Sequence, residues 1–188
     1  MKRAQFISIA ILALFLAHSA KAQRVSISTN TLEWLNLGTA NIEASIAISQ
    51  HFTLNAGVRY NPWEFHQENP YMVIQEKQKT AYFGARWWTW YVFSGWWAGI
   101  KIQYQDFAES GLWRPALDTW NAVGAGLSAG YTLMLTKHLN LDFGLGLWGG
   151  YKYRHVLYNS PATKDIRESG PKPFVAPDIL SVSIMYVF

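Results

Sequence analysis

One stretch of fifteen residues decides the fold of this chain: Leu139-Asn140-Leu141-Asp142-Phe143-Gly144-Leu145-Gly146-Leu147-Trp148-Gly149-Gly150-Tyr151-Lys152-Tyr153. Its odd positions, apart from Gly149, hold large apolar or aromatic residues. Its even positions, apart from Trp148, hold polar, charged or glycine residues. A period of two is typical of a β-strand whose two faces have different surroundings. A tilted strand of about 9–11 residues can cross a bilayer, so the stretch predicts a membrane-crossing strand with one lipid-facing side.

The same alternation recurs along the chain, and the connections between the alternating segments are by turns short and long. Short turns are expected at 50–51, 90–95 and 136–138, and long polar loops at 61–79, 106–119 and 155–177. This asymmetry is typical of outer-membrane barrels. We therefore predict an all-β fold, an eight-stranded antiparallel up-and-down transmembrane β-barrel with a filled polar lumen. The eight predicted strands cover about 25–32, 41–49, 52–60, 81–87, 96–105, 123–131, 139–153 and 179–188.

The N-terminal residues have the pattern of a secretory signal. Lys2 and Arg3 are basic, residues 6–17 are apolar apart from one serine, and Ala20-Lys21-Ala22 is a small-x-small cleavage site. The apolar run is too short for a membrane anchor of about 20 residues. We expect residues 1–22 to be removed and residues 23–188 to form a single domain in the bacterial outer membrane, with both termini in the periplasm.

The overall composition excludes some classes of protein. Removal of the signal reduces the 16 basic residues to 13, against 12 acidic ones, and such a balance argues against a nucleic-acid binder. The chain has no cysteine, so disulfides do not hold the fold. Charged residues make up only 15% of the chain, whereas Trp, Tyr and Phe occur ten times each, as expected of a protein with apolar surface against lipid. We expect no cofactor.

A soluble lipocalin-like barrel is the main alternative fold, because it shows the same alternation with the apolar face lining a cavity. A water-facing surface would be rich in Lys and Glu. The less apolar face of this chain is mostly Gly, Ser, Asn, Gln and Thr, which suits a narrow lumen. Aromatic residues at several strand tips would form interfacial girdles. We therefore favour the membrane barrel.

Seven charged side chains are predicted to face the lumen. Because a buried charge is costly unless it is paired, we expect Glu43 and Asp142 to pair with Arg59, Arg86 or Lys101. Such pairs would fill the lumen as a structural plug, and a narrow ion path remains an alternative. The predicted inward charges are Glu43, Arg59, Arg86, Lys101, Asp142, Lys152 and Arg154.

The sequence gives little support for catalysis or for a metal site. A barrel-rim enzyme acting on lipid A or phospholipid would need a Ser, a His and an acid in one geometry. The candidates are His155 with Ser160 and Asp165, or His66 with Glu64 and Glu68. His66 and His155 lie in different loops, and no His-x-x-x-His pair exists to hold a metal. We expect no enzymatic activity and keep the rim enzyme as the leading alternative.

The loops and the C-terminus are the expected contact surfaces. Trp63, Phe65, Tyr71 and Trp113 are aromatic residues in predicted loops that could anchor a partner or a glycan. They could instead pack on the rim or reach into outer-membrane lipid and lipopolysaccharide. The last strand alternates up to its end, and Tyr186 and Phe188 suit the signal that outer-membrane assembly machinery reads.

Five motifs together resemble an uncharacterised outer-membrane β-barrel family common in Bacteroides-type bacteria. The resemblance spans nearly the whole mature chain and implies an architecture similar to small OmpA/OmpX-type barrels. It brings no enzymatic residues. Because some members accompany fimbria genes, it also implies a possible surface or fimbrial protein as partner. The motifs are Ser28-Thr29-Asn30, Tyr60-Asn61-Pro62-Trp63, Gly84-Ala85-Arg86-Trp87-Trp88, Gly124-Ala125-Gly126 and Thr136-Lys137-His138-Leu139-Asn140-Leu141.

Overall fold

A computed structural model describes residues 24–66, 73–111, 116–159, 165–178 and 180–188. These residues form one antiparallel sheet of eleven strands and one short helix, so the predicted all-β antiparallel fold is confirmed. The elements are β1 (Val25–Asn30), α2 (Thr31–Leu35), β2 (Ala40–Ala47), β3 (Phe52–Asn61), β4 (Glu64–His66), β5 (Val73–Trp88), β6 (Gly95–Ser110), β7 (Leu117–Met134), β8 (Leu139–Tyr158), β9 (Ile166–Ser169), β10 (Lys172–Pro177) and β11 (Ser181–Val187).

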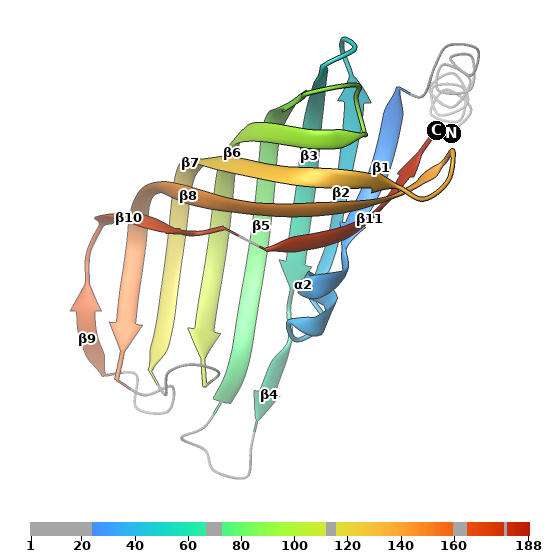
Figure 1. Cartoon of the computed structure of the whole chain (residues 1–188). Helices are drawn as coiled ribbons and strands as arrows, with labels where there is room; N and C mark the ends of the chain where they lie inside the picture. Colours follow the sequence, from blue (N-terminus) through green and yellow to red (C-terminus); the bar gives the residue numbers. More distant parts are fainter. Residues whose placement is uncertain (1–23, 67–72, 112–115, 160–164, 179) are drawn as a thin grey trace, which may run out of the picture.

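Eight of the strands pair in a closed ring, in the order β8-β11-β1-β2-β3-β5-β6-β7 and back to β8 (Figure 1). The ring closes because β8 pairs on both sides: Asp142 lies opposite Ser183 of β11 and opposite Thr132 of β7. β1 and β11 come from opposite ends of the chain and lie side by side, where the Phe188 amide donates to the Val25 carbonyl over 2.9 Å.

The two ends of the ring differ. The turn end carries the short connections 48–51, 89–94 and 135–138, and the loop end lies opposite. At the loop end β4 extends the sheet beside β5, and β9 and β10 pair with β8. The prediction of long loops here is therefore wrong in large part, because β5 to β8 run 16 to 20 residues each. The apolar alternation stops in these extensions while the backbone pairing continues, so hydropathy alone could not show them.

β10 is a strand although it contains two prolines. It pairs with β8 on one side and with no described strand on the other, and Figure 1 shows β10 and β4 at separate margins of the sheet. The Asp178 amide donates to the Gly146 carbonyl of β8 over 2.8 Å. Because amides alternate in direction along a strand, those of the odd-numbered residues face the free edge. Pro173 and Pro177 occupy two of these three positions, beside Val175, and so their missing N–H groups remove no pairing with β8.

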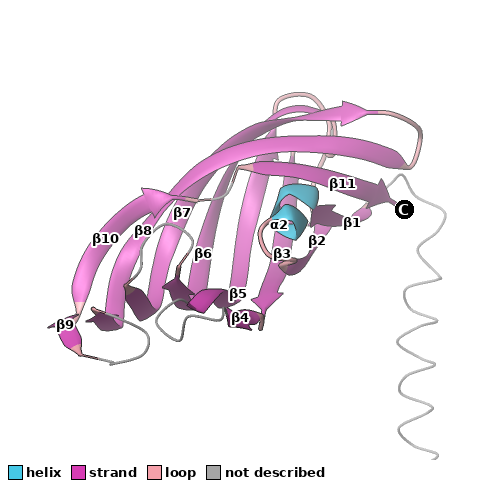
Figure 2. Cartoon of the chain, turned by 90° about the horizontal axis from the view of Figure 1, so that it is seen from below, coloured by secondary structure: helices cyan, strands magenta, loops and turns pink. Residues whose placement is uncertain are grey.

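A short helix replaces the predicted end of the first strand. The Asn30 side chain accepts from the Leu32 amide over 3.2 Å, which caps the helix. α2 packs against β11 and lies beside it in Figure 2. The Glu33 side chain is buried, while that of Leu35 is exposed. Among the described residues no helix is long and apolar enough to span a bilayer.

The strands bury polar side chains and expose apolar ones. In β3, Thr53, Asn55 and Arg59 are buried, whereas Phe52 and Val58 are about half exposed. Within the described part of the chain, 22 polar or charged residues are buried against seven hydrophobic ones, so the interior of the ring is predominantly polar.

A cluster of buried apolar side chains lies at the turn end of the interior. Trp88, Phe93, Trp97, Met185 and Val187 form a cluster whose members are all less than 5% exposed. The Trp88 and Phe93 rings meet edge to face with centroids 5.8 Å apart. This turn-end cluster fills the end of the ring that carries the short turns.

The prediction that Arg154 faces the interior is wrong, because its side chain is exposed. The register between β7 and β8 shifts: Asn121 lies opposite Arg154, but the next residue, Ala122, lies opposite Lys152. Tyr153 is therefore an extra residue in a β-bulge, which reverses the alternation beyond it.

Candidate functional site

The centre of the ring is organised around Arg86 of β5. Its guanidinium lies 2.7 Å from the Glu43 carboxylate of β2 and 3.2 Å from the Asp142 carboxylate of β8. It also lies over the Trp97 ring, 4.3 Å from the centroid. All three charged side chains are buried or nearly so, and the two pairs join β5 to β2 and to β8, neither of which is its neighbour in the ring.

Both carboxylates have neutral donors as well. The Trp97 indole donates to Asp142 over 2.7 Å and the Thr132 hydroxyl donates to it over 2.5 Å. The Tyr82 hydroxyl donates to Glu43 over 2.9 Å. Several donors to one buried carboxylate compensate for its lost hydration.

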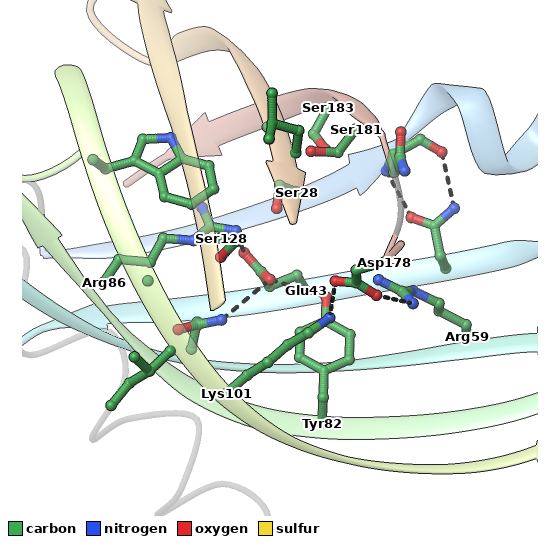
Figure 3. A pocket seen from close by; sticks show the side chains of 18 of the residues that line it. Ser28, Glu43, Arg59, Tyr82, Arg86, Lys101, Ser128, Asp178, Ser181 and Ser183 are labelled. Carbon is green, nitrogen blue, oxygen red and sulfur yellow. Dashed lines mark hydrogen bonds and ion pairs between the residues drawn. The ribbon is translucent and has the colours of Figure 1, made fainter. Parts of the chain in front are cut away.

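A second group of ion pairs lies nearer the loop end (Figure 3). Arg59 contacts Glu33 of α2 over 2.8 Å and Asp178 over 3.7 Å. The Lys101 ammonium also pairs with Asp178. Asp178 comes directly after β10. Its two ion pairs therefore connect the segment between β10 and β11 to β3 and β6 across the interior.

The structure thus brings five of the six residues predicted for the lumen network into one interior, and Lys152 lies apart from them. Sequence reasoning missed Glu33 and Asp178. Glu33 falls just after a predicted strand, and Asp178 falls between a proline-rich predicted loop and the last predicted strand, so no alternation identified them as inward residues. The only sequence feature that could have pointed to these two residues is their position beside the ends of predicted strands.

Glu33 is 2% exposed, and its environment changes its acidity. Burial raises the pKa of the Glu33 carboxyl above its ordinary value, although the Arg59 charge and the Asn30 amide oppose the effect. The Arg59 pair uses Oε1, whereas Oε2 has no hydrogen-bond partner among the described residues. Glu33 is therefore held in place mainly by Arg59.

The space left inside the network is small. A cavity of about 70 Å³ lies between the two groups of ion pairs. Since one buried water needs roughly 10–15 Å³ of such volume, the cavity has room for a few waters. Its lining includes Ser28, Asn55, Arg59, Tyr82, Lys101 and Asp178.

Glycine makes room for the large interior side chains. A Cβ on Gly57 of β3 would overlap the Tyr82 ring, and one on Gly130 of β7 would overlap Trp97. The narrow ring can hold these aromatic residues only because the facing strands carry no side chain there.

Lys152 lies in a separate aromatic cluster at the loop end. Its ammonium is 4.2 Å from the centroid of Trp120 and 5.5 Å from that of Phe174. The rings of Trp148 and Phe174 are 4.5 Å apart, and those of Phe107 and Trp120 are 4.9 Å apart. Among the described residues no carboxylate forms a salt bridge with Lys152.

The histidine candidates for catalysis are arranged differently from the predicted sets. His155 is 3% exposed and its Nε2 lies 3.1 Å from Asp118 of β7, whereas the predicted partner Asp165 is exposed. Ser160 and Glu68 lie outside the described residues, and Glu64 pairs with Lys77. In the part of the chain that the structure covers, no group of three His, Cys, Asp or Glu residues could hold a metal ion.

The predicted loop contacts are described only in part. Trp63 and Phe65 lie at the loop end, and both are about half exposed. Phe65 belongs to β4 rather than to a loop. Tyr71 and Trp113 lie outside the described residues.

These features define an all-β protein whose eight-stranded ring encloses a buried network of ion pairs. A family model described as a protein of unknown function (DUF3575) matches residues 7–188, so the chain belongs to this family. The predicted membership of an uncharacterised family is confirmed to this extent. No curated protein and no solved structure matches the chain.

Proposed function

We propose that this protein is a non-enzymatic outer-membrane β-barrel with a structural or surface-interaction role. The ring would cross the outer membrane, and the loop end would face the outside. Contacts with lipopolysaccharide or with a surface or fimbrial protein would be made through Trp63, Phe65, Tyr71 and Trp113. Residues 1–22 would be removed on export.

The observation that carries the proposal is the inverted distribution of polar and apolar side chains. Ile102 is 64% exposed and Leu127 is 68% exposed on the outer faces of neighbouring strands, while the interior is polar. Large exposed apolar patches on a protein mark surfaces that contact a partner or a membrane. A ring with apolar residues outside and polar residues inside is suited to lipid.

The spacing of exposed aromatic residues also supports a bilayer. Trp96 and Tyr104 both lie on the outer face of β6. Trp96 is near the turn end of the strand, and Tyr104 is closer to its loop end. Their eight-residue separation corresponds to about 26 Å along a strand. At the strand tilt of about 40° that is typical of membrane barrels, this length covers about 20 Å of the apolar band, which is about 25 Å tall.

The filled interior favours a structural plug over an ion path. The turn-end cluster occupies one end, the ion pairs occupy the middle, and the cavity between the two groups of ion pairs is only about 70 Å³. The same proposal includes an architecture similar to small OmpA/OmpX-type barrels, as the resemblance to the Bacteroides-type family implies. It also includes recognition of Tyr186 and Phe188 by the assembly machinery; both side chains are about half exposed.

The test compares two arginine substitutions at positions of similar exposure. Leu127 lies in the proposed lipid belt, whereas Ile166, 62% exposed, lies in β9 at the loop end. An arginine at the bilayer midplane costs about 2–4 kcal/mol in a membrane barrel and little near the interface. We expect Leu127→Arg to reduce outer-membrane assembly and the heat-modifiable shift on gels, and Ile166→Arg to leave both unchanged. Equal tolerance of both variants by a soluble protein without a shift would overturn the proposal.

A further inference from the structure

The short helix α2 borders one side of the ring at the loop end. β1 ends at Asn30 and β11 begins at Ser181, whereas β5 to β8 are 16 to 20 residues long. α2 follows β1 directly and packs against β11 and β2 (Figure 2). On this side of the ring, the element beyond β1 is therefore a helix and not a continuing strand.

α2 is joined directly to the backbone of β11. The Thr31 hydroxyl donates to the Val182 carbonyl over 2.7 Å, and the Val182 amide donates to the Asn30 side chain over 3.1 Å. Ile184 of β11 is exposed on the outer face, and Leu180, directly before the strand, is exposed as well. The helix therefore adjoins the apolar outer face of the ring.

The two exposed side chains of α2 are large and apolar. Successive residues of an α-helix are about 100° apart around its axis, so Leu35 lies almost opposite Glu33. Because Glu33 is directed into the interior by its pair with Arg59, Leu35 points away from the interior. Leu35 is 83% exposed, and Trp34 is 50% exposed.

The exposed surface of this segment also carries no charge. Glu33 is the only charged residue of the segment 31–38, and it is buried. A surface that faces water is normally rich in charged residues. The exposed strand β9 at the loop end fits that description, because it carries Arg167 and Glu168. The surface of α2 differs from it and resembles the outer faces of the ring-forming strands.

The backbone amides that follow α2 are paired within the segment. The four amides of residues 36–39 all donate to carbonyls of residues 33–36; the Gly38 amide, for example, donates to the Trp34 carbonyl over 3.0 Å. Backbone that is not part of a strand can lie against lipid only if its polar groups have partners. These four amides meet that requirement.

Exposed aromatic side chains border the same turn. Ala40, the first residue of β2, lies opposite Tyr60 of β3, which is about half exposed. A Cβ on Gly38 would lie 3.6 Å from the indole nitrogen of Trp63, so Trp63 lies beside the turn as well. Trp and Tyr are enriched where a protein crosses the interface between lipid and water, and Trp34 extends this aromatic group onto the helix.

We propose that α2 is an interfacial anchor whose Trp34 and Leu35 side chains insert into the bilayer at the loop end of the ring. An interfacial helix buries its apolar face about 5–10 Å into the boundary between headgroups and acyl chains. The anchor fixes the depth of the ring in the membrane on the side where no strand continues beyond β1. The inference rests on the proposed membrane location.

A second copy of the chain is a poorer occupant of this surface. A stable protein interface buries roughly 1,200–2,000 Å² in total, and the two exposed side chains of α2 supply only a small part of that area. A bilayer needs no such area at one point, because the outer faces of the strands contact it as well.

The experiment makes use of a chain without cysteine. Leu35→Cys, Leu127→Cys and Ile166→Cys each provide one site for a polarity-sensitive fluorophore, and all three positions are exposed. The labelled proteins are folded in phosphatidylcholine vesicles and checked for the heat-modifiable shift. Trp34→Cys provides a second site on α2. Fluorescence quenching is measured with aqueous iodide and with phosphatidylcholine that carries a nitroxide either close to the headgroup or near the end of an acyl chain.

The three positions should give three different patterns. On Leu35→Cys, we expect the nitroxide close to the headgroup to quench most, and iodide to quench several times less than on Ile166→Cys. On Leu127→Cys, the nitroxide near the end of the acyl chain should quench most. On Ile166→Cys, which lies in β9, iodide should quench most.

Three results on Leu35→Cys and Trp34→Cys would overturn the anchor. Iodide quenching as strong as on Ile166→Cys would place the helix in water. The pattern of Leu127→Cys would place it deep in the bilayer, and protection from every quencher would show that protein covers it. The label on Leu127→Cys separates this failure from that of the proposed function. Quenching of that label by iodide alone overturns both, whereas its quenching by the acyl-chain nitroxide limits the failure to the anchor.

Discussion

Removal of Arg86 tests whether the interior is a plug that stabilises the ring. Its side chain is 13% exposed, and it pairs with Glu43 and Asp142, which are 9% and 2% exposed. Arg86→Ala would leave two buried carboxylates without their shared cation. Breaking a buried pair by removing one partner costs about 3–5 kcal/mol. We expect the free energy of unfolding to fall by about that amount in urea titrations of the protein in vesicles.

Two further variants separate this effect from general damage. Arg154→Ala removes an exposed arginine of β8, the strand that also carries Asp142. It should change the free energy of unfolding by less than about 0.5 kcal/mol. The triple variant Arg86→Met, Glu43→Gln, Asp142→Asn removes all three charges together. It should recover at least about half of the loss, because a neutral replacement of a buried ion network is often tolerated.

The reasoning would be refuted if Arg86→Ala were as stable as Arg154→Ala, or if the triple variant were as unstable as Arg86→Ala. Conductance in planar bilayers provides an independent result. A plug predicts that stability falls while the unmodified protein conducts no measurable current. A change in conductance without a loss of stability would instead support the ion path.

Three other substitutions test particular contacts. Asp178→Asn should destabilise the ring by about 1–3 kcal/mol, because Lys101 loses its buried partner; an unchanged urea midpoint would contradict this. Gly57→Ala should cost about 1–3 kcal/mol, since the added methyl group overlaps the Tyr82 ring, and a variant of equal or greater stability would show that the ring is not tightly packed there. Pro173→Ala with Pro177→Ala restores two donors to the free edge and should increase self-association measured by crosslinking in detergent; an unchanged monomer fraction would argue against the role of the prolines.

The sequence allowed the ring to be predicted because its alternation is strong in the ring-forming parts of the strands. Leu139 to Tyr153 lies within β8, and β2 and β3 agree closely with their predicted bounds. Eight pairing strands therefore follow from hydropathy. β9 and β10 do not, because the charges and prolines of that region hide the pattern of two strands that pair with β8.

The interior network could be predicted only where the alternation holds. Glu43, Arg86 and Asp142 lie within regular strands, and so their inward direction follows from their parity. Arg154 lies beyond a β-bulge that reverses the parity. Asp178 and Glu33 lie outside regular strands, where the direction of a side chain depends on tertiary contacts that a period of two cannot express.

The pairing of β1 with β11 also sets the order in which the chain can fold. Residues 26–30 pair with residues 183–187, so the closing contact joins segments separated by most of the chain. Hairpins such as β7–β8 need only a local turn, but this contact must overcome the entropy of bringing distant segments together. Ring closure is therefore expected to be the last and slowest step. Until it occurs, β1 and β11 present unpaired strand edges, which are prone to aggregation. A chaperone would need to cover these edges.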